Sequence, residues 1–183
     1  MIRRYFKGLY QRTIREAYGR AHREIAGALA DGGRGLDCGS HDGHKYDVLS
    51  GMLDFPRERY FGVEWDAGLA SKARAKGLKV VRSDLNRALP FPDESFACVF
   101  GLSVLEHLLM PCRHLRECHR VVEPGGTLVI LTPNIATWFT ALLILMGKMP
   151  SSGPHPDSDL LVRQETPLKV SSEELGPDTE SDM

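Results

Sequence analysis

The ten residues from Arg34 to Gly43, RGLDCGSHDG, constrain the fold of this chain more than any other segment. A short apolar run leads into an acidic residue and two glycines, which is the spacing of a strand that enters a tight turn and then a helix. Such a turn directs backbone N–H groups and a helix N-terminus toward a place where an anionic or zwitterionic ligand can lie. The segment therefore predicts a ligand-binding loop after the first strand of an α/β domain.

The hydrophobic pattern after this loop alternates between the periodicities of strands and helices. Strands are expected at 34–38, 59–64, 78–82, 96–101 and 127–132, and helices at 43–53, 67–76 and 110–122. This alternation predicts a Rossmann-like, doubly wound, mostly parallel sheet with helices on both faces. The sequence EPGG at 123–126 predicts a turn between the last helix and the last strand.

The chain divides into three regions by composition and pattern. Apolar residues at three- and four-residue steps predict an amphipathic helical segment over 1–30, and the α/β domain is expected to occupy 31–149. Residues 150–183 are polar and acidic, and we expect a flexible tail, with a candidate hairpin at 160–170. The longest apolar run, 135–146, is shorter than the roughly 20 residues that cross a bilayer and predicts a core or interfacial helix.

The cysteines and the N-terminus indicate a reducing compartment. The four cysteines, Cys38, Cys98, Cys112 and Cys118, are not spaced as a disulfide framework. The N-terminus is rich in arginine and has no apolar stretch typical of a secretory signal. We therefore expect a cytoplasmic protein with reduced thiols.

Four later segments follow the glycine loop in a particular order, namely YFGVEWD at 60–66, VVRSDLNRALPFPDESF at 80–96, SVLEHL at 103–108 and RVVEPGGTLVILTPN at 120–134. In this order and spacing, the segments resemble the class I S-adenosylmethionine (SAM) dependent methyltransferases, above all the small-molecule branch called methyltransferase type 11. The resemblance covers about residues 30–146 and implies S-adenosyl-L-methionine as cofactor. The late helix–loop–strand pattern of that fold is not found after 134, so its C-terminal strands are expected to be missing or reduced.

The resemblance implies that the glycine loop holds the methionine end of the cofactor. Asp37 ends the first strand, and Gly39 and Gly43 let the backbone turn tightly and approach the ligand. Ser40 lies between these glycines and is implied as a cofactor contact. Leu102 lies where the fourth strand opens toward the transferred methyl group.

The resemblance also implies how the adenosine end is bound. Glu64 closes the second strand and accepts hydrogen bonds from the ribose hydroxyls, while Trp65 offers a flat apolar surface to the adenine. Asp84 accepts from the adenine amino group, and the Leu85 backbone contacts the ring edge. A solvated strand-end acid remains the alternative for Glu64, and a turn or helix-capping residue remains the alternative for Asp84.

Two residues depart from the family pattern. The middle glycine of D-x-G-x-G-x-G is His41, and histidine is among the non-glycine residues that tolerate a positive φ. The aspartate that usually follows a Ser-Phe pair is Ala97, which is expected to remove a loop hydrogen bond or to loosen the cofactor wall. A nicotinamide dehydrogenase, the rival for this fold, would instead show G-x-G-x-x-G at the start of the helix.

No catalytic group and no metal site follow from the sequence. His107, just past the fourth strand, is the best-placed candidate base by resemblance, but a histidine packed at a helix start explains it equally well. Cys112, His114, Cys118 and His119 form two helix-face pairs that point in different directions. Because no further pair completes a tetrahedral set, we expect no metal.

These observations favour a SAM-dependent methyltransferase that acts on a small-molecule acceptor. The alternative is a catalytically silent SAM-binding or partner-binding module with a truncated acceptor half. Peripheral membrane contact through the basic N-terminal helix is a weaker hypothesis. No nucleic-acid partner is expected, because the (D/N)PP(Y/F/W) segment that orients a flipped base is absent. The sequence leaves the oligomeric state open.

Overall fold

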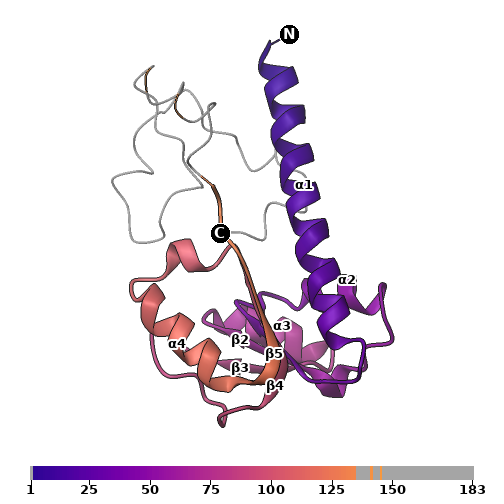
Figure 1. Ribbon diagram of the computed structural model, residues 1–183, viewed down its shortest axis with the longest axis vertical. Helices are drawn as coiled ribbons and strands as arrows, with labels where there is room; N and C mark the ends of the chain where they lie inside the picture. The colour runs from indigo at the N-terminus through magenta and orange to yellow at the C-terminus, as the bar shows by residue number, and fades with distance from the viewer. Residues whose placement is uncertain (1, 135–140, 142–144, 146–183) are drawn as a thin grey trace. The chain divides into compact units, whose positions relative to one another are not determined.

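The computed structural model describes residues 2–134, 141 and 145, and the side chains from residue 12 onward. Its five strands form one sheet in the order β3-β2-β1-β4-β5, and all neighbouring strands are parallel (Figure 1). The strands are β1 (Gly35–Cys38), β2 (Tyr60–Glu64), β3 (Lys79–Arg82), β4 (Phe96–Leu102) and β5 (Val122–Leu131). The helices are α1 (Ile2–Leu29), α2 (His44–Ser50), α3 (Ala67–Ala75) and α4 (Pro111–Val121), with 3-10 turns at Arg57–Arg59 and Leu105–His107. The predicted Rossmann-like fold class is confirmed.

The sheet and its helices belong to the compact unit Met1–Thr132. A second unit, Pro133–Met183, contains the apolar run at 135–146 and the acidic tail. Apart from residues 133, 134, 141 and 145, this unit lies outside the described residues, and so does the candidate hairpin at 160–170. The three predicted regions of the chain therefore stay a prediction. In the described part of the chain, no helix is long and apolar enough to cross a membrane.

Both faces of the sheet are covered by apolar layers. Leu36 and Cys38 of β1 pack in the layer beneath α4, together with Val99 of β4. The opposite layer contains Phe100 and Leu102 of β4, which pack with side chains of α1, α2 and α3. Every residue of β1 is buried, as expected for the central strand of a parallel sheet.

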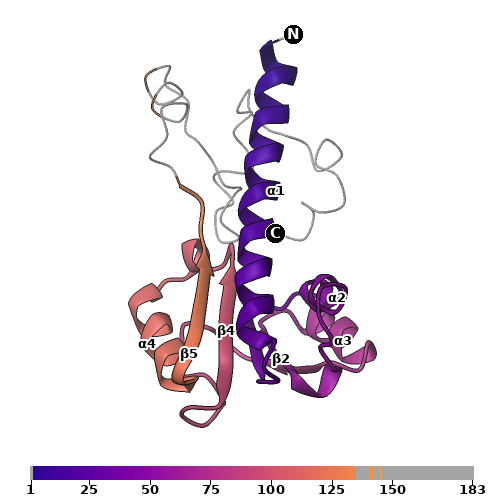
Figure 2. The same cartoon turned by 45° about the vertical axis from the view of Figure 1, so that its right-hand side comes forward.

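Helix α1 packs along β4 and β5 through its C-terminal half. Its buried residues Ala21, Ile25 and Leu29 recur every fourth position, so they lie on one face of the helix. The N-terminal half of α1 extends past the sheet on the side where the parallel strands end (Figures 1 and 2). The predicted N-terminal helix is therefore present and covers part of the sheet.

The segment at 123–126 differs from the predicted turn. Strand β5 already begins at Val122, directly after α4, and pairs there with Phe96. The register then shifts, so that Cys98 pairs with Thr127 and the intervening residues of β5 form an irregularity. Gly125 has a φ of +79°, which is the conformation that glycine adopts without strain. The glycines thus serve a bulge within a strand.

Ala97 lies at the amino end of β4, far from the carboxyl ends of the strands. Its backbone N–H donates to the carbonyl of Arg34 over 3.0 Å. A Cβ added to Gly33 would lie 2.2 Å from the Ala97 Cβ, so the Gly33 backbone packs directly against the Ala97 side chain. This departure from the family pattern therefore affects the start of β4. The expectation that it loosens the cofactor wall is wrong, because Ala97 does not lie at the edge where the strands end.

We predict that Gly33→Ala destabilises the fold, because its Cβ cannot coexist with that of Ala97. The expected loss of unfolding free energy is about 2 kcal/mol, as for other overpacked sites. Adding Ala97→Gly should recover much of this loss, since it removes the opposing Cβ. Chemical denaturation of the two variants measures both effects, and a double variant no more stable than the single one would contradict the contact. Gly27→Ala is the control, because nothing lies within 4 Å of its added Cβ.

Candidate functional site

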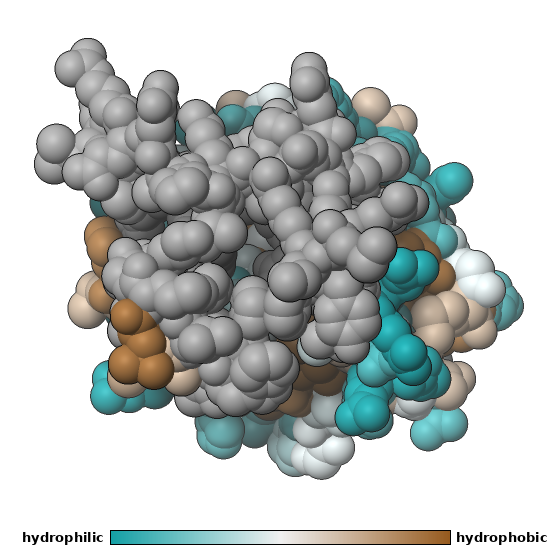
Figure 3. Space-filling view, turned by 90° about the horizontal axis from the view of Figure 1, so that it is seen from above, coloured by the Kyte–Doolittle hydropathy of each residue, from teal (hydrophilic) through white to brown (hydrophobic). Residues whose placement is uncertain are grey.

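The carboxyl ends of the parallel strands meet at one edge of the sheet. The glycine loop follows β1, Glu64 ends β2 and Trp65 follows it, Asp84 follows β3, and Ser103 follows β4. The chain continues from β1 to β2 and β3 on one side, and the connection after β3 returns to β4 on the other side of β1. This reversal creates a switch point at this edge. Ligands of open α/β sheets bind at such a point. Seen from this end, hydrophilic residues gather on the right of the described surface, and hydrophobic residues are visible at its left edge and beside the hydrophilic ones (Figure 3).

The glycine loop needs both of its predicted glycines. Gly39 has a φ of +81°, and a Cβ there would lie 2.6 Å from Val104. Gly43 has a φ of +85°, and its Cβ would lie 2.4 Å from the end of Leu78. His41 takes a φ of +50°, which places histidine in the left-handed region that the sequence anticipated. The loop is therefore a tightly packed turn, in which His41 is the non-glycine residue with a positive φ.

Glu64 connects the glycine loop to the next strand-end loop. One carboxylate oxygen accepts the backbone N–H of His41 over 2.8 Å, and the other accepts that of Asp66 over 2.9 Å. A carboxylate has about four acceptor positions, so two further hydroxyl groups can still donate to Glu64. The alternative of a freely solvated acid does not describe this residue.

Asp37 supports the loop from inside the protein. Its fully buried carboxylate accepts the Tyr60 hydroxyl over 2.6 Å and lies 3.5 Å from the ammonium of Lys45. Lys45 in turn donates to the carbonyl of Gly39 over 2.7 Å. Burial raises the pKa of Asp37, while Lys45 and the Tyr60 hydroxyl act in the opposite direction. Asp37 therefore acts on the loop through Lys45, a residue that no sequence signal singled out.

The adenosine-side residues divide into exposed and buried groups. The Trp65 side chain is 65% exposed, and the guanidinium of Arg82 lies 5.8 Å from its ring. Leu85 and Leu102 are buried in the two apolar layers, so only their backbone atoms are available at the edge. The Ser40 hydroxyl is buried against Gly62 and has no hydrogen-bond partner among the described residues.

Asp84 performs the turn role that the sequence left open. One of its carboxylate oxygens accepts both the backbone and the side-chain N–H of Asn86 over 2.9 Å. These bonds, the backbone one first, lower the pKa of Asp84. The second oxygen lies 3.7 Å from the Arg87 side chain, which is itself 80% exposed. A ligand role for Asp84 would therefore use this second oxygen.

Side chains from four elements surround the end of β4. Ser103 has a φ of +56°, and its hydroxyl lies 2.7 Å from that of Tyr18 on α1. Thr132, just after β5, donates to Glu106 over 3.1 Å, and the half-buried His107 follows in the same 3-10 turn. Sequence reasoning missed Tyr18, because nothing in the helical pattern relates it to a strand end 85 residues later.

We expect Lys45→Met to lower the free energy of unfolding by about 3 kcal/mol, because it leaves the buried Asp37 carboxylate without its cation. Adding Asp37→Asn should recover most of this loss, since a neutral amide still accepts from Tyr60. Urea denaturation of the single and double variants measures the coupling. The exposed Lys72→Met serves as the control, with a change below about 0.5 kcal/mol. A further loss of unfolding free energy in the double variant, in place of recovery, would refute the Asp37–Lys45 interaction.

A second prediction concerns pH. Burial, followed by the charge of Lys45, lowers the pKa of His44 to about 4, although Asp42 opposes both. The unfolded chain then binds more protons than the folded chain between that pKa and the ordinary histidine pKa of about 6.5. The stability that His44 contributes is therefore lost as the pH falls through this window. His44→Gln should flatten the rise of unfolding free energy with pH across it, and equal slopes for the two proteins would contradict this assignment.

The comparisons with known proteins agree with this geometry. Residues 36–130 match the profile of the type 11 family described as "Methyltransferase domain". A probable SAM-dependent methyltransferase of Mycolicibacterium smegmatis is 31% identical over 104 residues, which are 56% of this chain and 39% of the relative. A demethylmenaquinone methyltransferase of Chlorobaculum parvum is 32% identical over 93 residues, 49% of this chain and 31% of the relative.

The solved structures share the fold. A SAM-dependent methyltransferase of Thermotoga maritima, described as a possible histamine N-methyltransferase, aligns with a TM-score of 0.51 at 23% identity, over 75% of this chain and 67% of that one. The chain spans about two fifths of the length of the first curated relatives that it matches. The family match covers the glycine loop and every strand of the sheet. The chain therefore belongs to the methyltransferase-domain family of SAM-dependent methyltransferases.

Proposed function

We propose that this protein transfers a methyl group from SAM to a small-molecule acceptor. The observation that carries the proposal is the Glu64 carboxylate, which lies at the end of β2 and holds the backbone of the glycine loop. A ribose diol and a nearby zwitterion would be bound together by this arrangement, and SAM carries both groups. The exposed Trp65 ring fits the same ligand.

In this proposal each loop has one task. The glycine loop, supported by Asp37 and Lys45, lets the backbone pass close to the methionine end. Glu64 accepts the ribose hydroxyls, Trp65 covers the adenine, and the backbone near Leu85 contacts the ring edge. Asp84 offers its second oxygen to the adenine amino group.

The methyl group would emerge near Ser103, at the end of β4. Methyl transfer from a sulfonium is a direct displacement, so alignment of the acceptor with the methyl group contributes much of the rate. A base is needed only where the acceptor atom must lose a proton, and His107 lies in the adjacent turn. The strained Ser103 is held by the Tyr18 hydroxyl, as strained residues at functional sites commonly are.

The surroundings favour an acceptor with an apolar part. Leu109 and Met110 follow the His107 turn and are 76% and 50% exposed. The name of the Chlorobaculum parvum relative refers to demethylmenaquinone. A quinone-like or similarly apolar small acceptor is therefore the substrate class to examine first.

Glu64→Gln should weaken binding of S-adenosylhomocysteine at least tenfold, because the amide offers fewer acceptor positions to the ribose and disturbs the His41 contact. Isothermal titration calorimetry of the whole chain measures the dissociation constant. Glu58→Gln is a matched control, because Glu58 is an exposed acid in the 3-10 turn that precedes the same strand. Equal affinity in all three proteins would refute the site.

Turnover then distinguishes the methyltransferase from the silent module. Methyl transfer to any of a panel of small apolar acceptors, followed with radiolabelled SAM, would establish the activity. Binding of S-adenosylhomocysteine without transfer across the panel would favour a silent SAM-binding module.

A further inference from the structure

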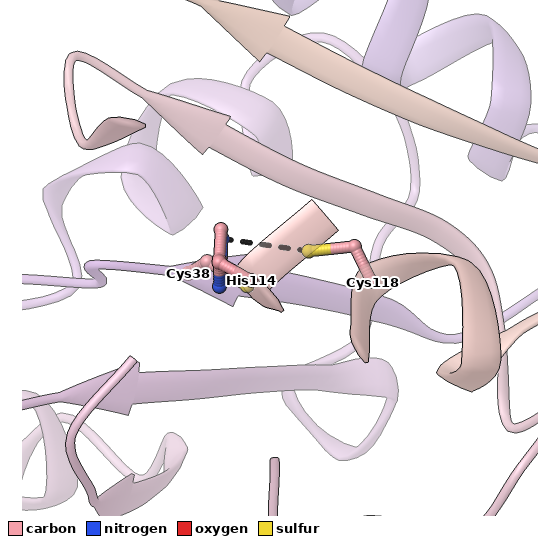
Figure 4. Close-up of side chains that lie close together, drawn as sticks. All are labelled: Cys38, His114 and Cys118. Carbon is pink, nitrogen blue, oxygen red and sulfur yellow. Dashed lines mark hydrogen bonds between the residues drawn. The ribbon is translucent and has the colours of Figure 1, made fainter. Parts of the chain in front are cut away.

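Two cysteines and a histidine that are distant in sequence meet between the sheet and α4. Cys38 is the last residue of β1, whereas His114 and Cys118 lie one helical turn apart on α4. In Figure 4 the His114 imidazole faces the Cys118 sulfur, with Cys38 beside it. The His114 Nε2 lies 3.4 Å from the Cys118 Sγ, and one potential ligand atom from each residue lies within 4.8 Å of the other two.

This cluster is sealed from solvent. Cys38 and Cys118 are 0% exposed, and His114 is 1% exposed. The second ring nitrogen of His114, Nδ1, is buried and has no hydrogen-bond partner in the described part of the chain. A buried polar atom without a partner costs free energy. Packing alone therefore does not explain the histidine, and its other nitrogen, Nε2, faces the Cys118 sulfur and is the atom that can bind a metal.

We propose that Cys38, His114 and Cys118 bind a zinc ion. Two thiolates and a neutral imidazole balance the charge of Zn²⁺, so the complete site is neutral, as a buried position demands. Sulfur and imidazole nitrogen are the ligands that zinc prefers, and a tetrahedral site places a sulfur and a nitrogen about 3.6 Å apart. The 3.4 Å separation of His114 and Cys118 is close to that value.

From the sequence we expected no metal, because only the cysteines and histidines of the predicted helix were considered as ligands. Cys112 and His119 are exposed and do not join the cluster, whereas Cys38 approaches from β1 and completes three ligands. The described residues offer no fourth protein ligand in this cluster, so the ion would have three protein ligands. The ion would tie α4 to the residue just before Gly39 and would stabilise the base of the glycine loop.

The test uses the full chain, kept reduced with a phosphine and stripped of metal by dialysis against a chelator. Titration with Zn²⁺ in competition with a chromophoric chelator should show one site of submicromolar affinity, and Zn²⁺ should raise the Tm. Cys38→Ala and Cys118→Ala should each weaken binding at least a hundredfold. The matched control is Cys112→Ala, an exposed cysteine on the same helix. Absence of binding, or equal loss in the control, would overturn the proposal.

Two measurements on the unmodified chain keep the proposal testable if a variant fails to fold. Co²⁺ in place of Zn²⁺ should give a thiolate-to-cobalt charge-transfer band. Bound Zn²⁺ should also slow alkylation of Cys38 and Cys118, measured by peptide mass spectrometry, and leave the rate at Cys112 unchanged. A cobalt spectrum without sulfur ligation, or protection of Cys112 instead, would show that zinc binds elsewhere and would refute the site.

Discussion

Strand β1 is the element on which the rest of this structure depends. It lies between β2 and β4, and all four of its residues are buried, so its side chains must be accommodated on both faces of the sheet. Alternation sends Leu36 and Cys38 into the layer beneath α4 and sends Asp37 to the opposite face, toward Lys45. The same strand carries the glycine loop at its end. The packing of its two faces therefore determines where that loop lies and how firmly it is held.

Two carboxylates hold the loop in different ways. Glu64 accepts a backbone N–H from outside the core and retains capacity for further donors. Asp37 is buried and acts through Lys45, whose ammonium donates to the Gly39 carbonyl. The buried ion pair is costly to desolvate and contributes little net stability. Removal of only one of its two charges would nevertheless be strongly destabilising, because the other charge would remain buried without a partner. The loop is thus preorganised before any ligand binds, which lowers the entropy that binding costs.

Helix α1 adds the Tyr18 hydroxyl to the groups at the strand ends. Its C-terminal half packs on β4 and β5, and this contact sets Tyr18 against Ser103 at the end of β4. In the proposed methyltransferase the helix is therefore part of the wall around the methyl group. The expected membrane contact of its basic N-terminal half stays a prediction, as does a cytoplasmic location.

The sequence by itself determined the fold class, the order of strands and helices, and the place of the glycine loop after the first strand, because periodicity and spacing are local properties of the chain. The ligand role of Glu64 came from the family resemblance and stays a proposal. The sequence also anticipated the positive φ of His41. It did not reveal the roles of Lys45, Tyr18 or the Cys38–His114–Cys118 cluster. Those contacts join residues far apart in the chain, or depend on which face of a strand or helix a side chain occupies once packed. Only the tertiary structure decided them, because pairing across layers follows from register and helix placement, which no single segment encodes.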